Sequence, residues 1–395
     1  MIHRFSVVPT APPDAILGLT EAFKADTNPA KMNLSVGVYK DETGQTPILD
    51  VVKAAEKVIL ETETTKGYLS IDGMPDYRDQ VRELVFGETV DANRVAVLQS
   101  PGGTGALRVA ADFMVAQLPK ARIWIPSPTW ANHPAIFTAA GLPSDTYRYL
   151  GDDRTSLDLD GMLQALREQA APGDAVLLHG CCHNPTGVDP SPADWQQIAS
   201  VIAEKQLLPL IDFAYQGFGD GVEEDAAGLR TILNAVDEAM VCTSFSKNFG
   251  LYSERVGAVS LVAADQAARD ASLSQLKRVI RCNYSNPPRH GAAIVATVLS
   301  DPELTAQWRQ ELEAMRVRIT QLRQQFVSAM QQRGHDFGFL LKQKGMFSFS
   351  GLNPMQVDEL KSKHGIYIVG SGRINVAGMI ESKMDVFCDA VASVI

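Results

Sequence analysis

The chain has 395 residues, of which 45% are hydrophobic and 21% charged, and this composition is that of a globular protein rather than a fibrous or disordered one. Its length allows one large core and a smaller one. The formal net charge of −10 would repel nucleic acids and anionic membranes. We therefore expect small molecules as ligands, with no nucleic acid and no membrane among the partners.

The N-terminal sequence and the cysteines predict a soluble protein in a reduced compartment. The first residues, MIHRFSVVPTAPPDAILGLTEAF, lack the apolar stretch of a secretory signal, and no apolar run approaches the ~20 residues of a membrane helix. The five cysteines include the adjacent pair Cys181 and Cys182, which fits a reduced compartment better than a disulfide framework. We expect a cytoplasmic location.

Six short apolar runs alternate with helical patterns between about 94 and 262. This alternation predicts a mostly parallel sheet flanked by helices, with ligands bound at the carboxyl ends of the strands. The runs are RVAVLQ, ARIWIP, DAVLLHG, LLPLID, AMVCTS and VGAVSLV.

The pattern changes from about 302, where apolar residues recur every three or four positions and predict one long amphipathic helix. These positions are Leu304, Trp308, Leu312, Met315, Ile319, Leu322, Phe326 and Met330. Short strands in MFSFSGL, IYIV and RINVAG follow, interleaved with helices around 355–363 and 381–394. They predict a smaller α+β domain, which the helix AILGLTEAF and the extended piece NLSVGVYK near the start would join.

The segment TSFSKNFG, residues 243–250, directly follows the fifth apolar run. A lysine at a strand end can form an imine with an aldehyde, while Ser244, Ser246 and the later Arg255 bind an anion. The segment therefore predicts a phosphate-bearing carbonyl cofactor attached to Lys247. A surface lysine in a serine-rich loop is the alternative.

Two further segments suit such a cofactor. Asp212 ends the run LLPLID, and a buried carboxylate there can keep a pyridine nitrogen protonated, while Tyr215 can bond a ring oxygen. An Asp that caps a helix and a packed Tyr are the alternative. The segment PGGTG, with Gly102, Gly103 and Thr104, opens a helical pattern whose free N–H groups can hold a phosphate, or it is a plain strand-to-helix turn.

The segment HGCCHNPTG, residues 179–187, contains soft metal ligands. On a strand His179 and Cys181 alternate with Cys182, so the adjacent thiols face opposite ways and convergence on zinc needs a break in the strand. We expect no metal site. Asn184, in the NPTG turn, can instead present its amide to a ring oxygen or a carboxylate at the sheet's carboxyl edge.

Three more side chains could complete the site. Trp130, after ARIWIP, can stack on a planar ring, although core packing explains most tryptophans. Arg373 in SGRINVAG and Arg281 in VIRCNYSNPP can each meet a carboxylate with two parallel hydrogen bonds, although most arginines are solvated surface residues.

Together, these segments resemble the class I aminotransferases of the fold type I pyridoxal-phosphate superfamily, and specifically the aspartate aminotransferase branch. The resemblance runs from end to end. It is carried by NLSVGVYKDETG, KGYLSIDGMPDY, PGGTGALRVAADF, SPTWANH, HGCCHNPTG, DFAYQGFGDG, TSFSKNFGLYSERVG, NYSNPPRHGA, GMFSFSGL and SGRINVAGM.

The resemblance implies an α/β fold in which a mostly parallel seven-stranded sheet is sandwiched by helices beside a smaller α+β domain. Residues 1–45 would form an N-terminal arm and part of the small domain, residues 46–310 the large domain that binds pyridoxal phosphate, and residues 311–395 the C-terminal small domain. It also implies a homodimer with shared active sites.

The resemblance further implies residue roles. Lys247 would form the Schiff base with pyridoxal 5'-phosphate, Asp212 would pair with its ring nitrogen, and Tyr215 would contact its ring oxygen. The other residues that hold the cofactor would be Gly102, Gly103, Thr104, Trp130, Asn184, Ser244, Ser246, Arg255 and, from the neighbouring subunit, Tyr68. The substrate would be bound by Gly37, Trp130, Asn184, Arg373 and the neighbouring subunit's Arg281.

The implied activity is amino transfer between L-aspartate or glutamate and 2-oxoglutarate or oxaloacetate by a ping-pong mechanism. An aromatic-amino-acid aminotransferase on the same scaffold is the first alternative, and a lyase or synthase of the superfamily the second. A nonenzymatic or zinc-binding protein is the alternative from other classes, against which the intact set of Lys247, Asp212 and Arg373 argues. One departure is Gly67, where the aspartate branch usually has an asparagine.

Overall fold

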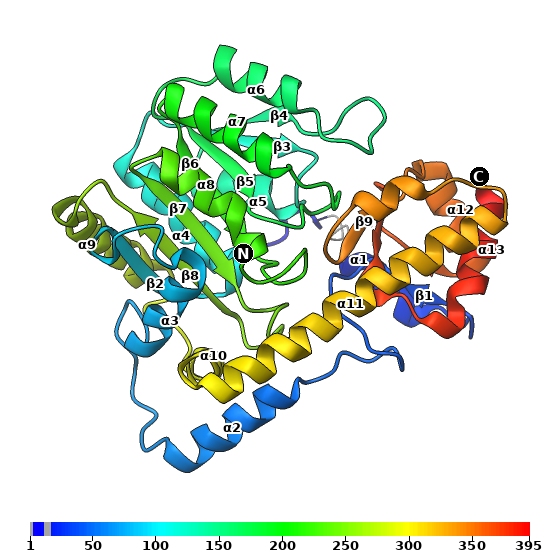
Figure 1. Cartoon of the computed structure of the whole chain (residues 1–395), viewed down its shortest axis with the longest axis horizontal. Coiled ribbons are helices and arrows are strands. Elements are labelled where there is room, and N and C mark those ends of the chain that lie inside the picture. Colours follow the sequence, from blue (N-terminus) through cyan, green and yellow to red (C-terminus); the bar gives the residue numbers. More distant parts are fainter. Residues whose placement is uncertain (1–2, 12–16) are drawn as a thin grey trace.

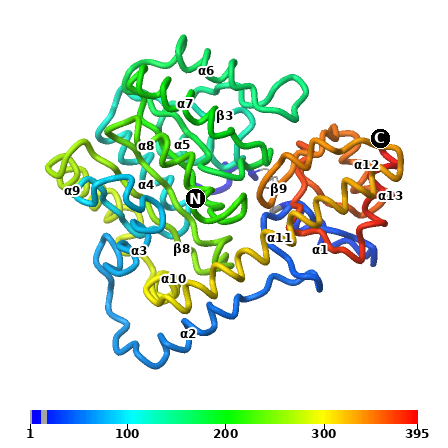
Figure 2. Tube along the Cα trace, in the orientation of Figure 1, coloured from blue at the N-terminus to red at the C-terminus, as the bar shows by residue number. Residues whose placement is uncertain are grey.

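A computed structural model describes residues 3–11 and 17–395. The chain forms a large body around a central sheet and a smaller body that contains the C-terminus, joined by the long helix α11 (Pro302–Gln332) (Figures 1 and 2). In the described part of the chain, no helix is both long and apolar enough to cross a membrane.

The central sheet has seven strands in the order β2-β8-β7-β6-β5-β3-β4. Only β8 runs antiparallel to its neighbours, which confirms the mostly parallel seven-stranded sheet. The apolar runs correspond to six of these strands, whereas the edge strand SDTYR is half exposed and carries no apolar signal. The strands are β2 (Val95–Pro101), β3 (Ile123–Ser127), β4 (Ser144–Arg148), β5 (Ala175–His179), β6 (Leu208–Phe213), β7 (Ala239–Ser244) and β8 (Val256–Val262).

Helices cover both faces of this sheet (Figure 1). Alternate residues of one strand enter different cores: Leu177 packs in one cluster, while Val176 and Leu178 pack in the other. A strand buried on both faces needs apolar residues at every position, which explains the continuous runs. The surrounding helices are α3 (Pro75–Phe86), α4 (Gly102–Gln117), α5 (Asn132–Ala140), α6 (Leu159–Glu168), α7 (Pro192–Glu204), α8 (Ala227–Ala235), α9 (Gln266–Asn283) and α10 (His290–Ser300).

The smaller body combines a segment from the N-terminal part of the chain with the C-terminal part. Strand β1 (Met32–Asn33) pairs in parallel with β10 (Ile366–Tyr367), and β9 (Phe347–Phe349) pairs antiparallel with β11 (Arg373–Asn375). Helices α12 (Pro354–His364) and α13 (Met384–Val394) pack there, near α1 (Leu17–Ala25) (Figure 1). Of the helix expected at AILGLTEAF, residues 15 and 16 lie outside the described residues.

Helix α11 links the two bodies. It begins where Asp301 caps the backbone N–H groups of Glu303 and Leu304, and its predicted apolar stripe is buried apart from half-buried Leu304. Helix α2 (Asp50–Thr62) packs along it (Figure 1). Helix α11 is continuous through 310 and 311, so one unbroken helix crosses the predicted domain boundary.

Candidate active site

The carboxyl ends of β2, β5, β6 and β7 open into one cavity of about 450 Å³. Parallel strands place the residues that follow them at one edge of the sheet, so segments far apart in sequence meet there. The predicted site residues that line the cavity are Gly37, Gly103, Thr104, Trp130, Asn184, Asp212, Tyr215, Ser244, Ser246, Lys247, Arg255 and Arg373.

Lys247 follows β7 and lies in the middle of this set. Its ammonium nitrogen is 4.7 Å from the centre of the Tyr215 ring. Burial lowers the pKa of Lys247 to about 8, with a contribution from the positive charge of Arg255, although Asp212 acts in the opposite direction. A substantial neutral fraction of this amine near neutral pH makes it a competent nucleophile and base.

Asp212, near the end of β6, is buried and lies against His133. Its Oδ2 is 3.1 Å from Nε2 of His133. Burial by itself would raise the pKa of Asp212, but the hydrogen bond to His133 and the electrostatic interactions with His133, His179 and Lys247 outweigh it and lower the pKa. The site therefore keeps a carboxylate where it can pair with a protonated ring nitrogen.

Tyr215, Asn184 and Arg373 form a polar wall. Nδ2 of Asn184 lies 3.4 Å from the Tyr215 hydroxyl, and Oδ1 of Asn184 accepts from Nη1 of Arg373 at 3.2 Å. Nη2 of Arg373 donates to the carbonyl of Ser35. The guanidinium of Arg373 lies over the Phe347 ring, 4.3 Å from the ring centre. Nε of Arg373 is buried and has no partner among the described residues, so the guanidinium retains a donor for a carboxylate.

Ser244, Ser246 and Arg255 form a part of the cavity wall that can bind an anion. Nη1 of Arg255 donates to the Ser246 hydroxyl at 3.3 Å, and the Ser244 hydroxyl donates to that of Ser246 at 3.2 Å. Gly102 has a φ of 74°, and a Cβ atom there would lie 2.6 Å from Nη2 of Arg255. The first turn of α4 can therefore approach a phosphate closely.

Three predicted site residues lie elsewhere. Gly102 adjoins the cavity wall through Arg255 but does not line it. Tyr68, 97% exposed, and Arg281 line a separate cavity together with Gly67. Their assignment to the neighbouring subunit's site remains a prediction.

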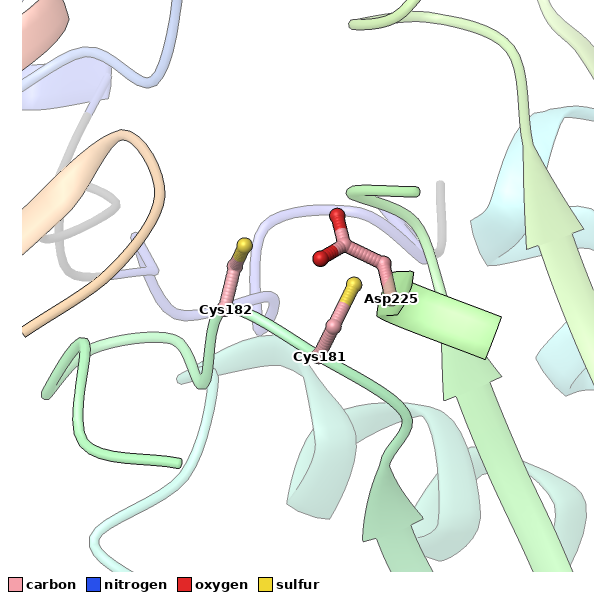
Figure 3. A group of neighbouring side chains, drawn as sticks. All are labelled: Cys181, Cys182 and Asp225. Carbon is pink, nitrogen blue, oxygen red and sulfur yellow. The ribbon is translucent and has the colours of Figure 1, made fainter. Parts of the chain in front are cut away.

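The thiols of Cys181 and Cys182 lie on the same side of the chain, beside Asp225 (Figure 3). Their sulfur atoms and one carboxylate oxygen are all within 4.8 Å of one another. The prediction that the thiols face opposite ways is wrong, because β5 ends at His179 and Cys182 has a left-handed φ of 50°.

The group in Figure 3 is nevertheless a poor metal site. Oδ2 of Asp225 accepts from the backbone N–H groups of Gly217 and Gly219, and its Oδ1 accepts from that of Asp220. Burial also raises the pKa of the Cys181 thiol. These contacts explain Asp225 as the anchor of the loop 217–220.

Several lining residues were not predicted, among them Val36, Leu107, Tyr252 and Phe347. Tyr252 lies within the motif TSFSKNFGLYSERVG, so its nearness to Lys247 was the available signal. Phe347 comes from β9 of the smaller body, and no local pattern indicates that it would reach the cavity.

The arrangement fits pyridoxal phosphate. It combines an amine with a lowered pKa, a buried carboxylate that can pair with a protonated ring nitrogen, and an anion cradle formed by Ser244, Ser246 and Arg255. The free donor of Arg373 would remain for the carboxylate of an amino acid.

Comparisons with known proteins agree with this chemistry. The family model described as aminotransferase class I and II matches residues 29–391. The chain is 52% identical to the aspartate aminotransferases of Salmonella typhi and of Escherichia coli K12, each over 99% of this chain and 100% of the relative. The crystal structure of the aromatic-amino-acid aminotransferase from Burkholderia pseudomallei, covalently bound to pyridoxal phosphate, has a TM-score of 0.96 and 48% identity, with 100% of both chains covered. The chain therefore belongs to the class I and II aminotransferases.

Proposed function

We propose that the protein is an aspartate aminotransferase, which transfers an amino group between L-aspartate or glutamate and 2-oxoglutarate or oxaloacetate with pyridoxal 5'-phosphate as cofactor. The observation that carries the proposal is that Lys247 and Arg373 line one cavity, and that Nε of Arg373 has no partner among the described residues. Lys247 would act on the α-carbon, which bears the amino group, and Arg373 would bind the α-carboxylate. The identity of 52% to two aspartate aminotransferases supports this substrate class.

Pyridoxal phosphate supplies, when bound, an electron sink for the electron pair left at the substrate's α-carbon. Asp212 would face its ring nitrogen, and Tyr215, whose pKa is raised by burial, would donate its hydroxyl hydrogen to the ring oxygen. The phosphate would be held by Gly103, Thr104, Ser244, Ser246 and Arg255, with Gly102 giving room for close approach. Trp130 would stack on the ring.

Lys247 would carry the proton. Its neutral Nζ would remove the proton from the α-carbon of the amino acid, and the resulting ammonium would deliver that proton to the cofactor carbon that bore the aldehyde, not back to the α-carbon. A pKa near 8 suits both directions, because each protonation state is accessible close to neutral pH.

Arg373 would orient the amino acid by a two-pronged bond to its α-carboxylate, with Asn184 and the backbone of Gly37 beside it. The distal carboxylate would meet Arg281 of a second subunit. The two carboxylates of the substrate would thus each pair with one guanidinium group, and this arrangement favours dicarboxylic amino acids over others.

A homodimer completes this site. Large apolar side chains are exposed on the N-terminal arm and around α2, namely Phe5 at 88%, Ile48 at 60% and Leu60 at 83%. An exposed apolar surface of this kind is typical of a protein–protein interface. A second copy of the chain would bury it and would also place its own Tyr68 and Arg281 at this cavity. The five cysteines are free, which supports a cytoplasmic location.

The division into residues 1–45, 46–310 and 311–395 is also part of this proposal. Gly37, Phe347 and Arg373 come from the two terminal parts, and Lys247 and Asp212 come from the middle one. Movement of the smaller body about α11 would therefore open and close the cavity over the substrate.

Aromatic amino acids are the second candidate substrates. At Gly67 a Cβ would meet only the Thr65 hydroxyl oxygen at 3.4 Å, so the cavity beside Arg281 has an open rim. The 48% identity to an aromatic-amino-acid aminotransferase supports this possibility. A screen with 2-oxoglutarate as acceptor, and aspartate, tyrosine, phenylalanine and branched-chain amino acids as donors, decides between them: a preference for tyrosine would overturn the proposal.

A further inference from the structure

The hydroxyl of Tyr252 joins the loop that contains Gly37 to the Lys247 side of the cavity. The backbone N–H of Tyr39 donates to this hydroxyl at 2.9 Å. Burial raises the pKa of Tyr252 to about 12, so the oxygen is that of a neutral phenol at ordinary pH. Tyr252 and Gly37 both line the cavity.

The rest of the loop is attached to the smaller body. Nδ2 of Asn375 donates to the carbonyls of Val36 and Val38, at 2.6 and 2.8 Å, and the N–H of Lys40 donates to the carbonyl of Ala377 at 3.0 Å. Within the described residues, the other backbone hydrogen bonds of 34–40 go to residues 33–40 or 367–377. Among the described residues, the hydrogen bond from the Tyr39 N–H to the Tyr252 hydroxyl therefore links the backbone of this loop to the large body.

Tyr252 also has a second contact with the cavity wall. Its main-chain carbonyl accepts from Nη1 of Arg255 at 3.0 Å, the same nitrogen that donates to Ser246. The two contacts are chemically separable, because replacing Tyr252 by Phe removes the hydroxyl and leaves the carbonyl.

We propose that Tyr252 is a positioning residue that holds the Gly37 backbone against the cavity, so that Gly37 and Arg373 meet the same substrate carboxylate. This inference rests on the proposed aminotransferase function. Without the hydroxyl, the N–H of Tyr39 loses its partner and the loop follows the smaller body alone. The substrate then has to order the loop by itself when it binds.

The test is Tyr252→Phe in the holoenzyme. One neutral hydrogen bond contributes about 1 kcal/mol, so the KM values for aspartate and 2-oxoglutarate should rise about fivefold. The kcat value and bound pyridoxal phosphate should change little, because Lys247 and the bond from Arg255 remain. Amide hydrogen exchange should accelerate in a peptide covering 36–40 but not in one covering 373–377.

Tyr147→Phe is the matched control, because the buried Tyr147 hydroxyl donates to a backbone carbonyl, that of Leu177 at 2.8 Å, away from the cavity. It should leave both KM values and the exchange of 36–40 unchanged. Unchanged KM values and exchange in Tyr252→Phe would overturn the inference. A wild-type enzyme without transaminase activity would instead overturn the proposed function, and the exchange experiment would still report on the loop.

Discussion

His133 and Asp212 form a buried pair in which Nε2 of the imidazole lies 3.1 Å from Oδ2 of the carboxylate. An ionised carboxylate only accepts hydrogen bonds, so Nε2 carries the hydrogen and Nδ1 can accept from the Thr129 hydroxyl, 2.8 Å away. His133 thus orients Asp212 and leaves Oδ1 for the occupant of the cavity.

Asp212→Asn should retain pyridoxal phosphate and lose turnover by orders of magnitude. The amide keeps the shape of the side chain but cannot balance the charge of a protonated ring nitrogen. Steady-state kcat and the absorbance of the bound cofactor measure the two effects. His133→Asn, which leaves the carboxylate in place, should cost less. Near-normal activity of Asp212→Asn would remove this residue from the mechanism.

The rate at which the cofactor-free protein captures pyridoxal phosphate should rise with pH and level off above about 8. Only the neutral amine attacks the aldehyde, and the lowered pKa of Lys247 means that this form dominates above about pH 8 rather than above the usual value of 10.5. Stopped-flow absorbance follows the reaction, and a free alkylamine corrects for ionisation of the cofactor itself. A rate that keeps rising to pH 10 would show that the site does not lower this pKa.

Borohydride reduction should then fix the cofactor covalently, and peptide mapping should locate it on Lys247. In Lys247→Ala the cofactor should bind without covalent attachment, and transamination should fall by at least about 10²–10⁴-fold, the range for loss of a general base. An adduct on another lysine would mean that the Schiff-base lysine was assigned to the wrong position.

Gly102→Ala should weaken cofactor binding. The new Cβ would lie 2.6 Å from Nη2 of Arg255 and would displace the guanidinium that borders the anion cradle. Gly173→Ala is a matched control, because Gly173 also has a positive φ, of 88°, but a Cβ there meets nothing within 4 Å. Both variants should lose about 1–2 kcal/mol of stability from backbone strain. Only Gly102→Ala should raise the Kd for pyridoxal phosphate; equal Kd values would dissociate the glycine from the cradle.

The sequence predicts most of the sheet because six strands are largely buried on both faces and consist mainly of apolar residues. It does not reveal β4, whose residues SDTYR lie half exposed at the edge, nor the antiparallel direction of β8. Direction depends on how the chain returns to the sheet, which no local pattern encodes.

The predicted site residues come mostly from segments that directly follow strands, where position along the chain implies position in space. Contacts made across the fold escaped prediction. The Tyr252 hydroxyl meets a backbone N–H 213 residues away, and the thiols of Cys181 and Cys182 converge because the chain leaves the strand at His179. Both features depend on backbone geometry rather than on residue type.

Arg281 should determine the preference for dicarboxylates. Its Nη1 donates to the hydroxyl of Ser285, which donates to Oδ1 of Asn286, and Nδ2 of Asn286 donates to the carbonyl of Leu69. This chain of bonds holds Arg281 beside the segment that carries Tyr68. In a homodimer, Arg281 and Tyr68 would therefore reach the neighbouring subunit's cavity together, held by the same hydrogen bonds.

Arg281→Asp should lower kcat/KM for aspartate by about 30-fold or more, since losing a partner of a desolvated charge pair costs about 2 kcal/mol or more. Phenylalanine should lose far less, because its side chain carries no charge for the new aspartate to repel. Arg278→Asp makes the same charge change on α9, at a residue that lines a different cavity, and should leave the ratio of the two kcat/KM values unaltered. Equal losses for both donors in Arg281→Asp would show that Arg281 does not read the substrate side chain.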